Sequence, residues 1–120
     1  MTPIPKDRLF LLKPDFSDAG FRQFCSECAM VEGMLSFYPS IRKALDIKYI
    51  NFTRPRKEIV SALGPDHQSS PLLIVGDAAN AKRAGPNVKI QAHGGKQFVN
   101  DPFMVCEYLA SVHGVGRPRK

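Results

Sequence analysis

Residues 9–28 read LFLLKPDFSDAGFRQFCSEC, and this stretch decides which fold we expect. Its continuous apolar run, Leu9–Leu12, has the length of a β-strand that is covered on both faces of a sheet. The stretch 15–24 holds Ser, Asp and Gly, which favour a loop. This loop leads to Cys25, after which apolar residues spaced by four and three positions predict a helix over about 28–38.

Downstream of this helix, β-forming residues, prolines and glycines mark the remaining elements. In chain order, we expect a strand over 47–52, a helix from Pro55 to Leu63, a central strand over 72–75, an edge strand over 96–99 and a helix from Asp101 to Gly114. Residues 76–87 predict an exposed excursion without a packed element. The order implies a parallel βαβ unit followed by two antiparallel strands. We therefore expect an α/β fold with a mixed four-stranded sheet flanked by helices.

The size and composition favour a single domain over residues 1–120. With 120 residues and 43% hydrophobic content, the chain can bury one core but not two. We expect a flexible N-terminus over about 1–7 and a basic C-terminal tail over about 115–120. The longest apolar runs are far shorter than the ~20 residues that cross a bilayer, so we expect no membrane partner. The net charge of +6 is scattered outside the tail, and without a nucleic-acid motif it predicts no nucleic-acid partner.

The N-terminus and the cysteine content bear on the compartment. Residues 1–7 lack the basic start and the apolar core of a secretory signal, so we expect a cytoplasmic protein. Three cysteines are an odd number, and a disulfide framework is unusual in a reducing compartment. The cysteines therefore point to redox or metal chemistry. Cys106 is the exception, because it lies on an apolar helical stripe and is expected to be buried and inert.

The pair Cys25 and Cys28 carries the chemistry that we expect. Cys25 would lie just before the first helix, where free backbone N–H groups and the helix dipole favour a thiolate over a thiol. Cys28 follows three residues later, close enough to attack a mixed disulfide formed on Cys25. These positions predict Cys25 as the nucleophile and Cys28 as the resolving thiol. The negative charge of Glu27 opposes part of the thiolate stabilisation, which favours a modest reductant over a strong oxidant.

Three motifs in this order resemble the thioredoxin superfamily, and within it the glutaredoxins and the N-terminal domains of glutathione transferases. They are Cys25-Ser26-Glu27-Cys28 after the first strand, Ser70-Pro71 before the third, and Asn100-Asp101 at the start of the last helix. The resemblance implies a thioredoxin-like fold of the glutaredoxin type, in which Pro71 is cis and lies beside the dithiol. It also implies that the backbone of Ser70 pairs with a peptide or glutathione, and that Asn100 and Asp101 lie near the γ-glutamyl end of glutathione.

More narrowly, the chain resembles an uncharacterised bacterial family of about this length with a thioredoxin-like fold, and that likeness implies no particular activity. The chain also departs from the better-known families. It has no Trp ahead of the dithiol, no Pro between Cys25 and Cys28, and no Glu-Ser pair before the last helix. These departures count against glutathione binding, so glutathione is a candidate co-substrate only through the resemblance, and no resident cofactor is expected.

Three functional hypotheses stay open. The first is a thiol–disulfide oxidoreductase acting on a thiol or disulfide substrate, a peptide or glutathione, as a monomer or weak homodimer. The second is a non-catalytic binding module of the same fold. The third is a zinc or cluster site, for which Cys25 and Cys28 supply half of a tetrahedral ligand set. The missing zinc ligands would come from a second chain or from Cys106, His67, His93 or His113.

Overall fold

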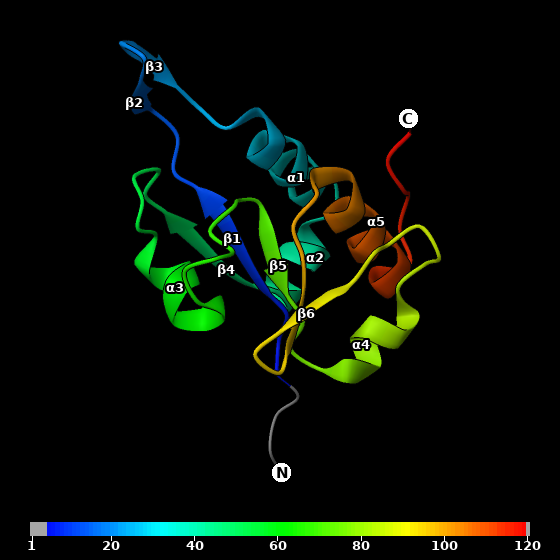
Figure 1. The fold of residues 1–120 in the computed structure, drawn as a ribbon. Helices are drawn as coiled ribbons and strands as arrows, with labels where there is room; N and C mark the ends of the chain where they lie inside the picture. Colours follow the sequence, from blue (N-terminus) through cyan, green and yellow to red (C-terminus); the bar gives the residue numbers. More distant parts are fainter. Residues whose placement is uncertain (1–4, 120) are drawn as a thin grey trace.

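A mixed five-stranded sheet lies at the centre of the computed structural model, which describes residues 5–119 (Figure 1). Its strands, in spatial order, are β4 (Asp46–Ile50), β1 (Arg8–Leu12), β5 (Leu72–Ile74), β7 (Lys96–Val99) and β6 (Gln91–His93). Strand β1 runs parallel to β4 and antiparallel to β5, and β7 runs antiparallel to both β5 and β6. The expected α/β fold with a mixed sheet is confirmed.

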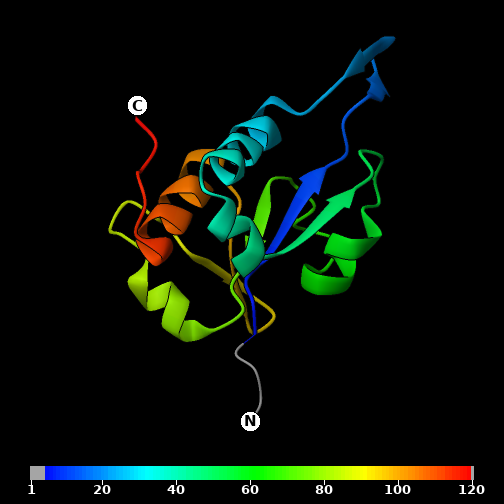
Figure 2. The same cartoon turned by 180° about the vertical axis from the view of Figure 1, so that it is seen from behind.

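Helices cover both faces of this sheet (Figures 1 and 2). Helices α1 (Ser26–Phe37), α2 (Pro39–Ala44) and α5 (Pro102–His113) lie on one face, and α3 (Lys57–Leu63) lies on the other. Because β1 and β5 are covered from both sides, the runs 9–12 and 72–74 are buried along their whole length. None of the helices in the described part of the chain is long and apolar enough to span a bilayer.

The sheet has five strands where the sequence predicts four, and the expected edge strand is not at the edge. Residues 91–93 pair with 96–99 in an antiparallel hairpin, so β6 takes the outer position and β7 lies inside it. Gly94 and Gly95 form the turn between them with φ angles of 58° and 78°. Only glycine adopts such angles readily, which explains the tight connection.

The stretch 15–24 is a hairpin and not the expected loop. Strands β2 (Phe16–Asp18) and β3 (Phe21–Gln23) pair antiparallel, separate from the central sheet. The turn residues Ala19 and Gly20 have φ angles of 52° and 81°, as a two-residue hairpin turn requires. Figures 1 and 2 show the hairpin projecting beyond the body of the molecule, just ahead of α1.

The stretch 76–87 and the start of α3 differ from the sequence prediction. The excursion over 76–87 contains α4 (Ala78–Arg83), which begins where the Asp77 side chain accepts the N–H of Ala79 at 2.9 Å. None of the residues of α4 is buried, so it has no apolar stripe by which a sequence pattern could identify it. Helix α3 begins at Lys57, two residues later than predicted, because the chain at Arg56 is still extended.

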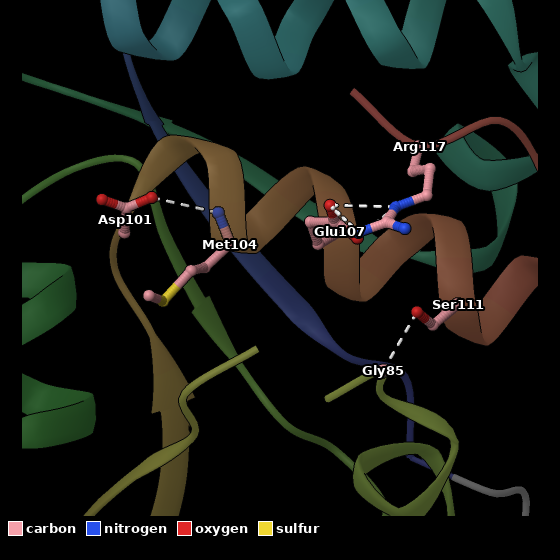
Figure 3. Close-up of polar contacts among 6 residues, drawn as sticks. All are labelled: Gly85, Asp101, Met104, Glu107, Ser111 and Arg117. Atoms are coloured by element: carbon pink, nitrogen blue, oxygen red, sulfur yellow. Dashed lines mark hydrogen bonds and ion pairs between the residues drawn. The ribbon is translucent and has the colours of Figure 1, made fainter. Parts of the chain in front are cut away.

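Helix α5 has the ends that the sequence predicts and several polar contacts along its length (Figure 3). The carboxylate of Asp101 accepts the N–H of Met104 at 3.0 Å, which confirms Asp101 as the cap of the helix. Gly114 ends it in the left-handed conformation. In addition, Arg117 of the C-terminal tail pairs with the buried Glu107 at 2.8 Å, and the backbone of Gly85 donates to Ser111 at 3.1 Å.

The N-terminal segment corrects another expectation. Residues 1–4 of the predicted flexible N-terminus lie outside the described residues, as does Lys120 of the basic tail. Asp7, however, is only 2% exposed. Its carboxylate accepts the N–H of Gly76 at 2.7 Å and the hydroxyl of Tyr108 at 2.7 Å. The chain just before β1 is therefore fixed to the start of the α4 region and to α5.

Candidate functional site

Cys25 lies at the N-terminal end of α1, as the sequence predicts. Its backbone is extended, and its Sγ accepts the N–H of Cys28 at 3.2 Å. The carbonyl of Cys25 accepts the N–H of Ala29 at 2.9 Å, which is the first hydrogen bond of the helix. A sulfur at this position faces the unpaired N–H groups of the first helical turn, and these groups and the helix dipole stabilise negative charge on it.

Cys28 has a different environment, although it is in the first turn of the same helix. Its side chain is only 5% exposed, and its Sγ accepts the N–H of Leu12 at 3.5 Å. The Oγ of Ser70 lies 3.4 Å from the same sulfur. Burial, together with the hydrogen bond to Cys25, raises the pKa of the Cys28 thiol to about 11. Cys28 therefore keeps its proton at neutral pH.

Ser70 connects the dithiol to the centre of the sheet. Its hydroxyl lies 2.9 Å from the carbonyl of Phe10 and donates to it. A hydroxyl has one proton, so in the contact between Ser70 and Cys28 the thiol is the donor and the Ser70 oxygen the acceptor. The Ser70–Pro71 peptide bond is cis, as the resemblance implies. The carbonyl oxygen of Ser70 lies 4.0 Å from the Sγ of Cys25, so this residue contacts both sulfurs.

A cavity of about 290 Å³ opens at the two sulfurs. Apart from the cysteines, its lining is mostly apolar and consists of Leu11, Leu12, Pro14, Phe24, Ala29, Glu32 and Tyr49. The carboxylate of Glu32 is engaged by Arg42 at 2.9 Å and by the hydroxyl of Tyr49 at 2.9 Å. Phe24 comes from the segment that joins the β2–β3 hairpin to α1, and 64% of its side chain is exposed. The cavity thus offers an apolar surface next to the partly exposed sulfur of Cys25.

Arg56, just before α3, is buried, which the sequence did not indicate. It is 7% exposed, and its guanidinium donates to the carbonyls of Phe52 at 3.0 Å and Gln68 at 2.7 Å. Burial lowers the pKa of Arg56, whereas the Coulombic interactions with Cys28 and Cys25 act in the opposite direction. A single arginine in a polar loop carries no periodic signal, so only the tertiary structure shows that it is buried.

Of the remaining candidate residues, Asn100 contacts the loop before β5 and Asp101 caps α5. Asn100 donates to the hydroxyl of Ser69 at 3.4 Å and accepts the amide of Gln91 at 2.9 Å, so it adjoins the loop that ends at Pro71. The carboxylate of Asp101 is engaged in capping α5. The structure thus brings Cys25, Cys28 and the Ser70-Pro71 pair together. Asn100 contacts Ser69, the residue that precedes Ser70 in the sequence.

Cys106 and the histidines are the residues from which a metal site at the dithiol would take its missing ligands. Cys106 is buried as predicted, and burial raises the pKa of its thiol to about 11. His67 and His93 contact each other, with ring centroids 4.8 Å apart. Within residues 5–119, no group of three or more His, Cys, Asp or Glu side chains is arranged to hold a metal ion.

The fold and the site define an α/β protein that presents a cysteine pair at the start of a helix. A family model described as a protein of unknown function, DUF3088, matches residues 6–117, and the chain therefore belongs to that family. No curated protein matches the chain, and neither does a solved structure.

Proposed function

We propose that this protein is a thioredoxin-like thiol–disulfide oxidoreductase in which Cys25 attacks the substrate and Cys28 resolves the mixed disulfide. One observation carries the proposal: the partly exposed Sγ of Cys25 lies at the N-terminus of α1, 3.2 Å from the N–H of Cys28, whose own thiol is buried. The first sulfur is partly exposed and accepts a backbone N–H of the first helical turn. The second sulfur, that of Cys28, stays protonated until the resolving step.

The proposed reaction uses both sulfurs in turn. The Cys25 thiolate attacks one sulfur of a substrate disulfide, the substrate S–S bond breaks, and the departing thiolate takes up a proton from solvent. Cys28 then gives its proton to solvent and attacks the Sγ of Cys25. The mixed disulfide breaks, the second substrate thiolate leaves, and a Cys25–Cys28 disulfide remains. Two molecules of an external thiol must return the two electrons and leave joined as their own disulfide, and glutathione is the candidate co-substrate.

The architecture supports a thioredoxin-like fold for this chemistry. Strands β1 and β4 form the parallel unit around α1, and β5 and β7 form an antiparallel pair, as the resemblance implies. Ser70 and Pro71 precede β5, and Ser70 adjoins both sulfurs. In this arrangement the backbone at Ser70 and Pro71 would form hydrogen bonds with the backbone of a peptide substrate or glutathione. A reducing cytoplasm would keep the dithiol in its active form.

The cavity indicates the kind of substrate that fits best. Its apolar lining, with Phe24 exposed at its rim, favours a disulfide flanked by apolar side chains, as in a peptide. Asn100 adjoins the same loop on the side of β6 and would contact the more polar end of a bound molecule. We place Asp101 in the same substrate region, although its carboxylate is engaged with the helix backbone.

The test is reduction of a glutathione mixed disulfide by the wild-type protein and three single variants. Cys25→Ser should abolish turnover, and Cys28→Ser should stop after one step and accumulate the covalent adduct. Cys106→Ser is the matched control, because this buried thiol should leave the rate unchanged. Disulfide reduction that persists in Cys25→Ser would contradict the proposed attack by Cys25.

A non-catalytic binding module is the second candidate, and the apolar character of the cavity at the dithiol favours it. Such a module would bind a peptide in this cavity without forming a covalent bond. Equal binding of a reduced peptide by the wild-type protein and by Cys25→Ser, with no disulfide reduction by either, would select this candidate over the oxidoreductase.

A further inference from the structure

Another cavity, of about 670 Å³, lies between β2 and the segment that joins β4 to α3. Phe16 and Ser17 line it from β2, and residues 51–58 line the rest. Its volume is in the range of sites that bind small molecules. None of its lining residues belongs to the cavity at the two sulfurs, so a ligand bound here would not occupy the dithiol site.

The charged side chains around this cavity are mainly cationic. Arg54, Arg56 and Lys57 contribute positive charges, and Glu58 contributes a negative one. Three positive charges against one negative charge leave the lining with a net charge of +2. Positive charges that converge on one concave site attract a small anion and raise its local concentration.

Arg56 differs from the other two cations because it is buried. It is only 7% exposed, whereas Arg54 and Lys57 are exposed. Within residues 5–119 no carboxylate forms an ion pair with Arg56, and this includes the exposed Glu58. Burying a charge is costly unless the charge is paired. Arg56 therefore carries a fixed positive charge that a bound anion would compensate.

The guanidinium of Arg56 is held in place with part of its donors unused. Its Nε donates to the carbonyl of Phe52 at 3.0 Å, and its Nη1 donates to the carbonyl of Gln68 at 2.7 Å. The other terminal nitrogen, Nη2, has no hydrogen-bond partner among the described residues. In that part of the chain, the only buried side-chain nitrogen or oxygen without a partner is Nε2 of His113, so Nη2 of Arg56 remains accessible.

We propose that this cavity binds a phosphate group, either as free phosphate or as a phosphate monoester of a small molecule. Nη2 of Arg56 would donate to the phosphate oxygens, because a guanidinium presents its N–H groups in a planar fork that suits phosphate. Arg54 and Lys57 would add attraction from exposed positions. The net charge of the lining matches a phosphate dianion better than a singly charged carboxylate. This inference does not rest on the proposed function.

The test is calorimetric titration of the full chain with inorganic phosphate and with phenyl phosphate, at constant ionic strength and about pH 8, where phosphate is a dianion. We expect both to bind the wild-type protein, and the tighter of the two distinguishes free phosphate from a monoester as the preferred ligand. Arg56→Gln, which removes the fixed charge, should weaken both by about tenfold or more. Phenylacetate is the carboxylate control and should bind at least about fivefold more weakly than phenyl phosphate.

Two exposed residues of the lining test its charge without changing the buried arginine. Glu58→Gln removes a like charge and should tighten phosphate binding about threefold, whereas Arg54→Gln should weaken it about threefold. Lys48→Gln is the matched control, because it removes one positive charge from an exposed position of β4 outside this cavity. It should leave the affinity within about twofold of wild type. These variants test the inference even if Arg56→Gln fails to fold.

Several results would overturn the inference. They are no binding of phosphate or phenyl phosphate to the wild-type protein at about 10 mM ligand, phenylacetate bound as tightly as phenyl phosphate, and an unchanged phosphate affinity in folded Arg56→Gln. Equal phosphate affinities of Glu58→Gln, Arg54→Gln and Lys48→Gln would overturn it as well, because the charge of the cavity would then have no effect. Each of these results leaves the proposed function of the dithiol intact.

Discussion

The hydroxyl oxygen of Ser70 lies 3.4 Å from the sulfur of Cys28 and at the same time 2.9 Å from the carbonyl oxygen of Phe10. Two hydrogen bonds in series therefore run from the Cys28 thiol through the Ser70 hydroxyl to the backbone of β1. Because the Ser70 hydroxyl donates to Phe10, the Cys28 thiol is the donor to Ser70 in the resting protein. The arrangement also offers the hydroxyl as a donor to the sulfur once the proton has left, because a hydroxyl can rotate between the two partners.

Replacing Ser70 should therefore affect both the resolving step and the stability. In Ser70→Ala, we expect resolution by Cys28 to slow several-fold and the free energy of unfolding to fall by about 1 kcal/mol, since the Phe10 carbonyl loses its partner. Single-turnover kinetics and urea unfolding measure the two effects. Ser69→Ala is the matched control, because Ser69 contacts Asn100 and not a sulfur. Equal effects of both variants would contradict the role of the hydroxyl.

The three cysteines should differ in reactivity. At pH 7, iodoacetamide should label Cys25 in the folded protein and spare Cys28 and Cys106, because both are buried thiols whose pKa is raised to about 11. Peptide mass spectrometry identifies the labelled positions, and labelling in urea serves as the control in which all three react. Labelling of Cys28 or Cys106 as fast as Cys25 in the folded state would show that the described environment is wrong.

The buried thiol of Cys106 should make the protein less stable in alkaline solution. Burial raises its pKa from 9.0 to about 11 in the folded state, so the stability it contributes is complete below pH 9 and is lost as the pH rises toward 11. Between pH 8 and pH 10.5, the wild-type protein should lose about 1–2 kcal/mol more stability than Cys106→Ala. Urea unfolding at the two pH values measures this difference, and an equal loss in both proteins would argue against it.

The contact between Tyr108 and Asp7 joins residues 101 positions apart and should be important for stability. Burial and the Asp7 carboxylate raise the pKa of Tyr108, so the hydroxyl stays protonated and donates to Asp7. Tyr108→Phe leaves the buried carboxylate with fewer donors and should cost about 1–3 kcal/mol of unfolding free energy.

The matched control is Tyr38→Phe, since the half-buried Tyr38 donates no side-chain hydrogen bond within the described chain. This variant should change the free energy of unfolding by less than about 0.5 kcal/mol. Thermal and urea unfolding compare the two variants. Equal free energies of unfolding for Tyr108→Phe and Tyr38→Phe would mean that the hydrogen bond from Tyr108 to Asp7 does not stabilise the protein.

Several features could be predicted because their signals lie in neighbouring residues. The apolar runs 9–12 and 72–75 are typical of strands buried on both faces, and β1 and β5 occupy such positions. The ends of α5 follow from Asp101 and Gly114, which satisfy backbone groups within one helical turn. The position of Cys25 at the start of α1 is of the same kind, since it depends on where one helix begins.

Other features depend on residues that are far apart in the chain. The sequence does not show that β6 pairs with β7, that residues 16–23 form a hairpin or that α4 exists, because these elements bury little apolar surface of their own. Asp7 is buried only because Tyr108 and Gly76 reach it.

The amino-acid sequence by itself determined the α/β class, the buried strands, the capped helix ends and the position of Cys25 at the start of α1, because each depends on local backbone preferences and periodicity. Only the tertiary structure decided that Cys28 is buried against Ser70 and that Arg56 is enclosed without an ion pair in the described chain. The ionisation of a buried group depends on the charges and dipoles that surround it in space, and long-range packing brings those together.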